Sequence, residues 1–153
     1  MRKLLIASAL VSLLAGCAAN SPYGNYSKAP AAVDRAMATD TVAHLVKFYP
    51  PALTRWNIMQ PGEDAYGKAL VELLRARGYS VMEFAPDSAA KEQASPQKPS
   101  ALGVDLRYVV DSLAPVADMY RVTIFVGSQP ISRAYLPQQN GTVSAAGSWA
   151  RKE

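Results

Sequence analysis

The chain has 153 residues, of which 16 are basic and 12 acidic, giving a formal net charge of +4. This length fits one compact domain. The basic residues form no cluster of the kind that follows a phosphate backbone, so the sequence argues against direct binding of nucleic acid.

The first nineteen residues carry the strongest signal. A cationic start, Met1-Arg2-Lys3, precedes an apolar run from Leu4 to Ala15 that is shorter than the roughly 20 residues of a membrane-spanning helix. This pattern predicts a secretory signal peptide over residues 1–16. Its end resembles the lipobox of bacterial lipoproteins, because small residues precede the only cysteine of the chain, Cys17. The expected recognition residues for the signal peptidase are Leu14, Ala15 and Gly16.

We predict that Cys17 is lipidated and becomes the N-terminus of the mature chain, since a thiolate is the nucleophile that takes the lipid. Acylation leaves no thiol for a disulfide, a thiolate metal site or a cysteine nucleophile. Removal of residues 1–16 also removes Arg2 and Lys3, which leaves 14 basic and 12 acidic residues. The mature chain therefore carries a net charge of only +2.

Residues 17–29 are mostly small, polar and turn-forming, which predicts a flexible lipidated tether. Ala18 stands at the position where an aspartate often keeps bacterial lipoproteins at the inner membrane. We therefore expect an anchor in the outer membrane of a Gram-negative bacterium, with the domain facing the periplasm. Residues 30–153 are expected to form this single domain.

A first helix is predicted from Pro30 to Tyr49, because Pro30 suits a first helical turn and Pro50-Pro51 ends the helix. We expect Asp34 to lie outside its buried face. Residues 53–59 are predicted to follow as a short strand. The buried face of the helix is expected to contain Val33, Met37, Thr41, His44, Leu45 and Phe48.

A second helix is predicted after the turn Pro61–Asp64, whose two acidic residues lie at the positive end of the helix dipole. Gly78 suits the left-handed position after this helix, and residues 79–84 form the next strand. If both strands share a sheet, the strand–helix–strand unit is expected to cross over with a right hand. The buried stripe of the helix should contain Tyr66, Ala69, Leu70, Leu73 and Leu74.

Residues 86–101 contain three prolines and no large apolar side chain, so we predict a disordered loop within the domain. Four β segments are predicted to follow, and the first two alternate apolar and polar side chains as half-buried strands do. The predicted ranges are 103–112, 119–126, 131–136 and 142–150.

Asn140-Gly141 is a strong hairpin signal before the last of these strands. The expected inward side chains of that strand are Val143, Ala145 and Trp149. Together the elements predict an α+β fold, in which two helices pack on a small mixed, mostly antiparallel sheet of about five to six strands.

Common catalytic and nucleotide-binding motifs are missing from the sequence, among them G-x-S-x-G, the P-loop, G-x-G-x-x-G, H-E-x-x-H and C-x-x-C. His44 is the only histidine, and it could pair with Asp40 one helical turn earlier. A lone histidine on a helix is more often structural, and by itself it forms no histidine-rich metal site.

Two pairs of carboxylates also have simpler explanations than acid–base catalysis. Glu63 and Asp64 suit the helix dipole, whereas Asp105 and Asp111 belong to the polar face of a strand, beside Arg107. We predict no enzymatic activity, no metal, no cofactor and no small-molecule substrate. Trp56, Trp149 and the eight tyrosines are expected mainly in the core and at interfaces, and an aromatic ligand cleft stays open as a minor alternative.

Six short blocks occur in order along nearly the whole chain: Tyr49–Ala52, Leu74–Tyr79, Leu106–Asp111, Tyr120–Gly127, Ile131–Tyr135 and Gly147–Trp149. With the lipobox near residue 17, a length near 150 residues and a strand-rich C-terminal half, these blocks resemble TrbH, the conjugal transfer lipoprotein family. None of them is a catalytic signature.

The resemblance implies a subunit of the mating-pair formation apparatus, a type IV secretion system that moves plasmid DNA between cells. The expected partners are the membrane, through the lipid on Cys17, and other channel proteins of conjugal transfer. An edge strand, expected at Ile131–Leu136, could add to the sheet of such a partner. Two alternatives stay open: a free-standing envelope lipoprotein that binds a small ligand, and a lipoprotein that blocks redundant conjugation.

Overall fold

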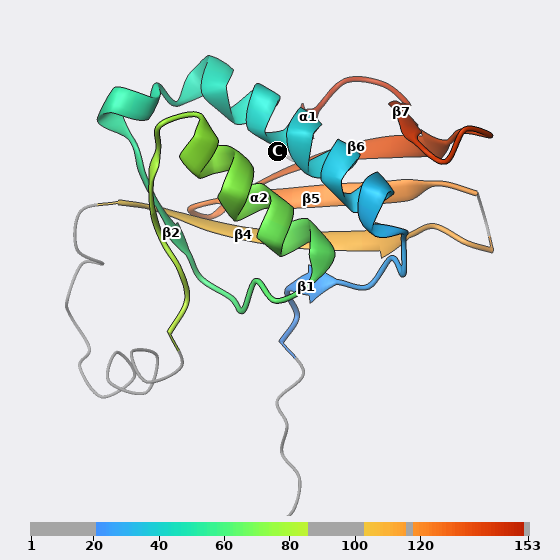
Figure 1. Cartoon of the computed structure of the whole chain (residues 1–153), viewed down its shortest axis with the longest axis horizontal. Helices are drawn as coiled ribbons and strands as arrows, with labels where there is room; N and C mark the ends of the chain where they lie inside the picture. Colours follow the sequence, from blue (N-terminus) through green and yellow to red (C-terminus); the bar gives the residue numbers. More distant parts are fainter. Residues whose placement is uncertain (1–20, 86–102, 116–117, 152–153) are drawn as a thin grey trace, which may run out of the picture.

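The computed structural model describes residues 21–85, 103–115 and 118–151, and the loop predicted over 86–101 lies outside these ranges. Two α-helices and eight strands make up the described chain (Figure 1). In order, the elements are β1 (Gly24–Asn25), α1 (Ala31–Phe48), the 3-10 helix η2 (Pro51–Leu53), β2 (Arg55–Ile58), α2 (Ala65–Ala76), β3 (Ser80–Met82), β4 (Val104–Ser112), β5 (Tyr120–Val126), β6 (Gln129–Pro137), β7 (Val143–Ala145) and β8 (Ala150–Arg151).

The described strands form one mixed sheet in the order β3-β2-β4-β5-β6-β7. Strands β3, β2 and β4 run parallel, and β4 to β7 follow as an antiparallel meander. Two short strands lie off this path, since β1 pairs parallel with β4 and β8 pairs antiparallel with β6. The predicted α+β class is confirmed. The sheet has eight strands rather than five to six, because β1 and β8 are two-residue pairings without a sequence signal.

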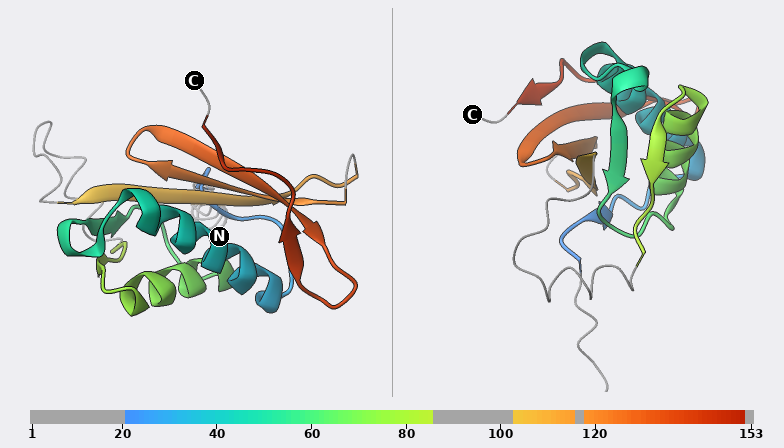
Figure 2. Two further views of the ribbon diagram at one scale, coloured as in Figure 1. Left: turned by 90° about the horizontal axis from the view of Figure 1, so that it is seen from above. Right: turned by 90° about the vertical axis from the view of Figure 1, so that its left-hand side faces the viewer.

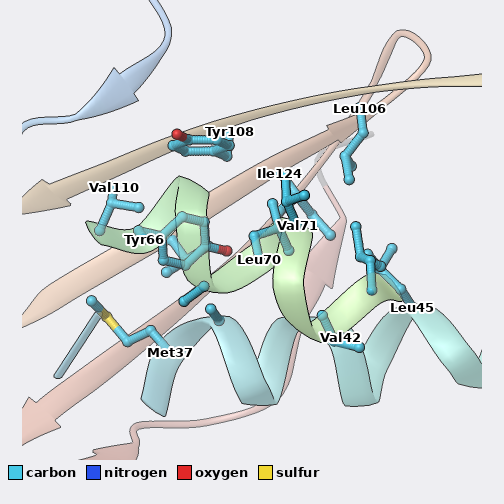
Figure 3. Close-up of a cluster of buried hydrophobic side chains, with 14 of the residues drawn as sticks. Met37, Val42, Leu45, Tyr66, Leu70, Val71, Leu106, Tyr108, Val110 and Ile124 are labelled. Carbon is cyan, nitrogen blue, oxygen red and sulfur yellow. The ribbon is translucent and has the colours of Figure 1, made fainter. Parts of the chain in front are cut away.

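Both helices cover the same face of the sheet (Figure 2). Figure 3 shows their side chains meeting those of β4 and β5 in the core. The buried face of α1 is largely as predicted, with three exceptions, of which the first is His44, which is only half-buried. Phe48 is 64% exposed at the end of the helix, whereas Asp34, expected outside the buried face, is only 2% exposed. Ala38 and Val42 complete the buried face of α1.

The strand–helix–strand unit of β2, α2 and β3 is confirmed, with its two strands paired in parallel. Asp64 caps α2, because its side chain accepts a hydrogen bond of 2.9 Å from the Gly67 N–H. Gly78 follows the helix with φ of +85°, the left-handed conformation that favours glycine. The predicted stripe is confirmed except at Leu73, which is half-buried, while Val71 is buried beside the stripe.

The long strands β4 and β5 alternate as predicted, with Leu106, Tyr108 and Val110 buried on β4. The predicted strand over 142–150 is wrong in part. It divides into β7 and β8, which pair with different parts of β6, and Ala145 is exposed rather than inward.

Gln60 completes the pairing of β4 where β2 ends. Its side-chain Oε1 accepts from the Tyr108 N–H at 2.9 Å, and its Nε2 donates to the Tyr108 carbonyl at 3.1 Å. Strands β2 and β1 pair with the same edge of β4, at Leu106 and Val109 respectively, and the Gln60 amide fills the gap between them at Tyr108. Gln60 is 1% exposed, so both backbone groups of Tyr108 depend on it rather than on water.

We therefore expect Gln60→Leu to destabilise the domain by about 2–5 kcal/mol, because two buried backbone groups lose their partner. Urea unfolding followed by circular dichroism measures this change. Gln138→Leu is the matched control, since Gln138 is exposed and we expect a change below about 0.5 kcal/mol. Equal stability of the two variants would contradict this role of Gln60.

Candidate functional site

The predicted lipidation site, Cys17 with Leu14, Ala15 and Gly16, lies outside the described residues. The described chain begins four residues after Cys17, at Ser21, so the structure reports how the segment next to the predicted anchor joins the domain.

Tyr23 lies on the face of the sheet opposite the helices. Its ring packs edge-on against Phe125 of β5, with 5.4 Å between ring centroids. The guanidinium of Arg107 lies 5.5 Å from the centroid of the same ring, a cation–π distance. Arg107 and Phe125 are cross-strand partners, and both alternate with buried residues. The N-terminal segment therefore starts on the face of the sheet opposite α1 and α2, which we call the open face.

The chain then passes to the helix side of the sheet. Gly24 and Asn25 pair with Val109 and Val110 of β4. Asn25 Nδ2 donates to Asp34 Oδ2 on α1 at 2.9 Å. The N–H and hydroxyl of Ser27 both donate to Asn25 Oδ1, at 3.0 and 2.7 Å. We call Asn25, Ser27 and Asp34 the N-terminal latch.

The tether predicted over 17–29 is therefore too long. Residues 24–29 belong to the folded domain, because they contain β1 and two members of the N-terminal latch. Short polar residues predicted a flexible segment, but here their side chains hydrogen-bond the backbone and α1.

Asp34 is the unusual member of the latch, since Oδ1 of this buried carboxylate has no hydrogen-bond partner. Burial is the main reason that its pKa rises to about 6 from an ordinary value of 3.8. The hydrogen bond from Asn25 opposes this rise, and the charge of Asp64 adds to it. The folded domain therefore binds a proton at Asp34 more tightly than the unfolded chain does.

We expect Asp34→Asn to stabilise the domain at pH 7 by about 1–3 kcal/mol, because the raised pKa reports the cost of the buried charge. The contribution of Asp34 to wild-type stability falls as the pH rises from about 4 to about 6, where only the unfolded chain is ionised. The free energies of unfolding of wild type and Asp34→Asn, measured in urea, should thus differ at pH 7 and become equal below pH 4. Asp118→Asn, at an exposed position, is the control. A destabilised Asp34→Asn at pH 7 would contradict the cost assigned to this charge.

His44 and Asp40 do not form a hydrogen-bonded pair. The Asp40 carboxylate instead accepts from Arg133 Nη1 at 2.9 and 3.0 Å and from the Tyr135 hydroxyl at 2.7 Å. The His44 ring stacks on Trp149 at 4.8 Å between centroids, and desolvation lowers the pKa of His44. These contacts support the structural interpretation of His44, because its predicted acidic partner is occupied elsewhere.

Three of the four carboxylates in the two predicted pairs are engaged in structural contacts. Asp64 accepts from the Tyr108 hydroxyl at 2.6 Å in addition to capping α2. Asp111 pairs across the strands with Arg121. Asp105 accepts from the side-chain amide of Asn57 at 3.3 Å. Within the described ranges, no three His, Cys, Asp or Glu residues form a group that could hold a metal ion.

The two tryptophans do not share a cleft. Trp56 is fully buried in the core, where its ring packs against Tyr49 and Tyr79. Trp149 lines a hollow of about 170 Å³ with His44, Phe48 and Arg151. Of the aromatic residues considered for a ligand cleft, Trp149 and Tyr49 line this hollow.

The free edges of the sheet differ from the predicted one. The segment Ile131–Leu136 lies inside the sheet, because β6 pairs with β5 on one side and with β7 and β8 on the other. The sequence predicted a strand over 131–136 but did not reveal that the C-terminal segment divides into β7 and β8, which both pair with β6. In the described chain, the sheet ends at β3 on one side and at β7 and β8 on the other.

No helix among the described residues is both long and apolar enough to cross a membrane. Comparisons with curated proteins and with solved structures find no match for this chain. The family described as conjugal transfer protein TrbH matches residues 20–153, which include the whole described domain. The chain therefore belongs to the TrbH family of conjugal transfer proteins.

Proposed function

We propose that this TrbH-family chain is an outer-membrane lipoprotein that serves as a structural docking subunit of a conjugative type IV secretion apparatus. Family membership, which makes it a conjugal transfer protein, is the observation that carries the proposal. The predicted lipobox at Cys17 supplies the anchor, and acyl chains bound there hold a protein stably because each buried methylene contributes about 0.8 kcal/mol.

The architecture supports docking rather than catalysis. Three of the titratable side chains discussed above make structural contacts: Asp64 caps a helix, Asp40 binds Arg133, and His44 stacks on Trp149. The edge strand β3 presents Ser80 and Met82 at its surface, and an exposed edge can pair with the backbone of a neighbouring subunit. On this proposal, β3 and the edge formed by β7 and β8 are the surfaces that contact other transfer proteins.

Plasmid transfer in a strain that lacks the gene tests this function. The lipidated wild type should restore transfer, and His44→Ala should restore it equally. Ser80→Lys combined with Met82→Lys should reduce transfer at least about tenfold, since lysines on an edge oppose strand addition. Ala145→Lys makes the same test at β7, and Thr39→Lys, exposed on α1, is the matched charge control.

Each result has a distinct meaning if the variants stay folded and membrane-bound. Loss of transfer in His44→Ala alone would contradict the docking proposal and favour an enzymatic or ligand-binding role. Normal transfer with lysines at both edges would contradict docking through the sheet edges. Normal transfer in the deletion strain, combined with increased transfer into that strain as a recipient, would favour the lipoprotein that blocks redundant conjugation.

A further inference from the structure

The face of the sheet opposite α1 and α2 is left open by the described helices (Figure 2). The N-terminal segment reaches it first, because Tyr23 rests there on Phe125 and Arg107. The described chain passes from Tyr23 on the open face directly to β1 at the edge of β4, so the predicted anchor joins the domain where the open face meets this edge.

The length of chain between anchor and face is short. Cys17 precedes Tyr23 by six residues. Six extended residues span at most about 20 Å. A domain of this size has a radius of gyration of about 13 Å, so its diameter exceeds the reach of this segment. The side of the domain that carries Tyr23 consequently stays close to the surface in which the acyl chains of Cys17 are inserted, and the chemistry of the open face then favours its turning toward that surface.

The chemistry of the face suits phospholipid headgroups. Tyr23 and Tyr26 bring aromatic rings with polar ends next to the anchor, and Tyr26 is 53% exposed. Such rings favour the interface between lipid and water. The β4 and β5 side chains on this face carry balanced charge, which matches a zwitterionic surface. The charged members are Asp105, Arg107, Asp111 and Arg121.

We propose that the open face of the sheet lies against the phospholipid leaflet that holds acylated Cys17, with α1 and α2 on the aqueous side. This orientation rests on the proposed lipid anchor, and it adds which face of the domain is turned toward the bilayer. The free edges of the sheet, at β3 on one side and at β7 and β8 on the other, then face along the plane of the membrane. Partner subunits that pair with these edges approach sideways, parallel to the bilayer.

Fluorescence quenching by lipids tests the orientation in the full acylated protein. Because Cys17 is the only cysteine and is acylated, a second cysteine gives a single labelling site. Ala134→Cys places an environment-sensitive fluorophore on the open face, and Thr39→Cys places it on exposed α1. The labelled proteins are reconstituted into zwitterionic phosphatidylethanolamine–phosphatidylcholine vesicles that contain headgroup spin-labelled lipid. We expect quenching to be about two- to threefold greater at Ala134→Cys, since a helix layer about 10 Å thick separates Thr39 from the sheet.

Vesicle flotation separates the orientation from the anchor on which it rests. If Cys17→Ser floats with vesicles as the wild type does, the anchor is wrong and the orientation fails with it. If only the wild type floats but both labels are quenched equally, or Thr39→Cys more strongly, the anchor stands and the orientation is overturned. In that case the open face is turned away from lipid and is accessible to a protein partner.

Discussion

Leu70→Asp should unfold the domain. Leu70 is 0% exposed in the middle of α2, where its side chain lies in the core between the helices and the sheet (Figure 3). A carboxylate there has no partner, and its burial costs several kcal/mol, comparable with the total stability of about 5–15 kcal/mol for a domain. Circular dichroism and thermal melting of the soluble, unlipidated domain measure the loss of cooperative unfolding.

Leu73→Asp is the matched control on the same helix. Leu73 is only half-buried, so its carboxylate reaches water and the variant should stay folded with a lower melting temperature. A Leu70→Asp protein that melts within a couple of degrees of wild type would show that α2 does not pack in the core as described.

Cys17→Ser should abolish lipidation. A hydroxyl does not replace the thiolate as the acceptor of the lipid in this reaction, so the precursor accumulates uncleaved or a processed form becomes soluble in the periplasm. Metabolic labelling with a radioactive fatty acid should mark the wild type and leave the variant unlabelled.

Ala18→Ser is the control, because it changes the neighbouring residue and leaves the thiol in place. It should be labelled like the wild type. Equal label on wild type and Cys17→Ser would remove the lipoprotein interpretation, and with it the membrane orientation, while membership of the TrbH family would stand.

Strong local patterns predicted much of the fold. The stripe of α2 has a clear helical period, and Asp64 and Gly78 stand where a helix begins and ends, so local sequence sufficed for this element. Strands β4 and β5 alternate strictly, which identified their buried faces. These features depend on neighbours within a few residues, and such neighbours are visible in a single sequence.

Contacts between distant residues explain what could not be predicted. Asp40 appeared available to His44 four residues later, but its partners are Arg133 and Tyr135, more than 90 residues away. Gln60 lies between the predicted strand over 53–59 and the predicted turn at Pro61–Asp64, and only the position of Tyr108 gives it a place in the sheet. Asp34 was expected outside the buried face of the first helix, whereas Asn25 of the preceding segment hydrogen-bonds its carboxylate. In each case a polar side chain follows the tertiary arrangement rather than its own propensity.

The parallel pairing of β1 with β4 decides where a soluble fragment of this protein should start. A fragment that begins at Pro30, the boundary suggested by sequence, would lack Asn25 and leave the Asp34 carboxylate without its donor. It would also uncover the β4 edge at Val109 and Val110, and unpaired edges of this kind promote aggregation. A fragment for crystallisation or binding studies should therefore begin no later than Ser21. It then retains residues 24–29, which sequence alone assigned to the flexible tether and which belong to the domain.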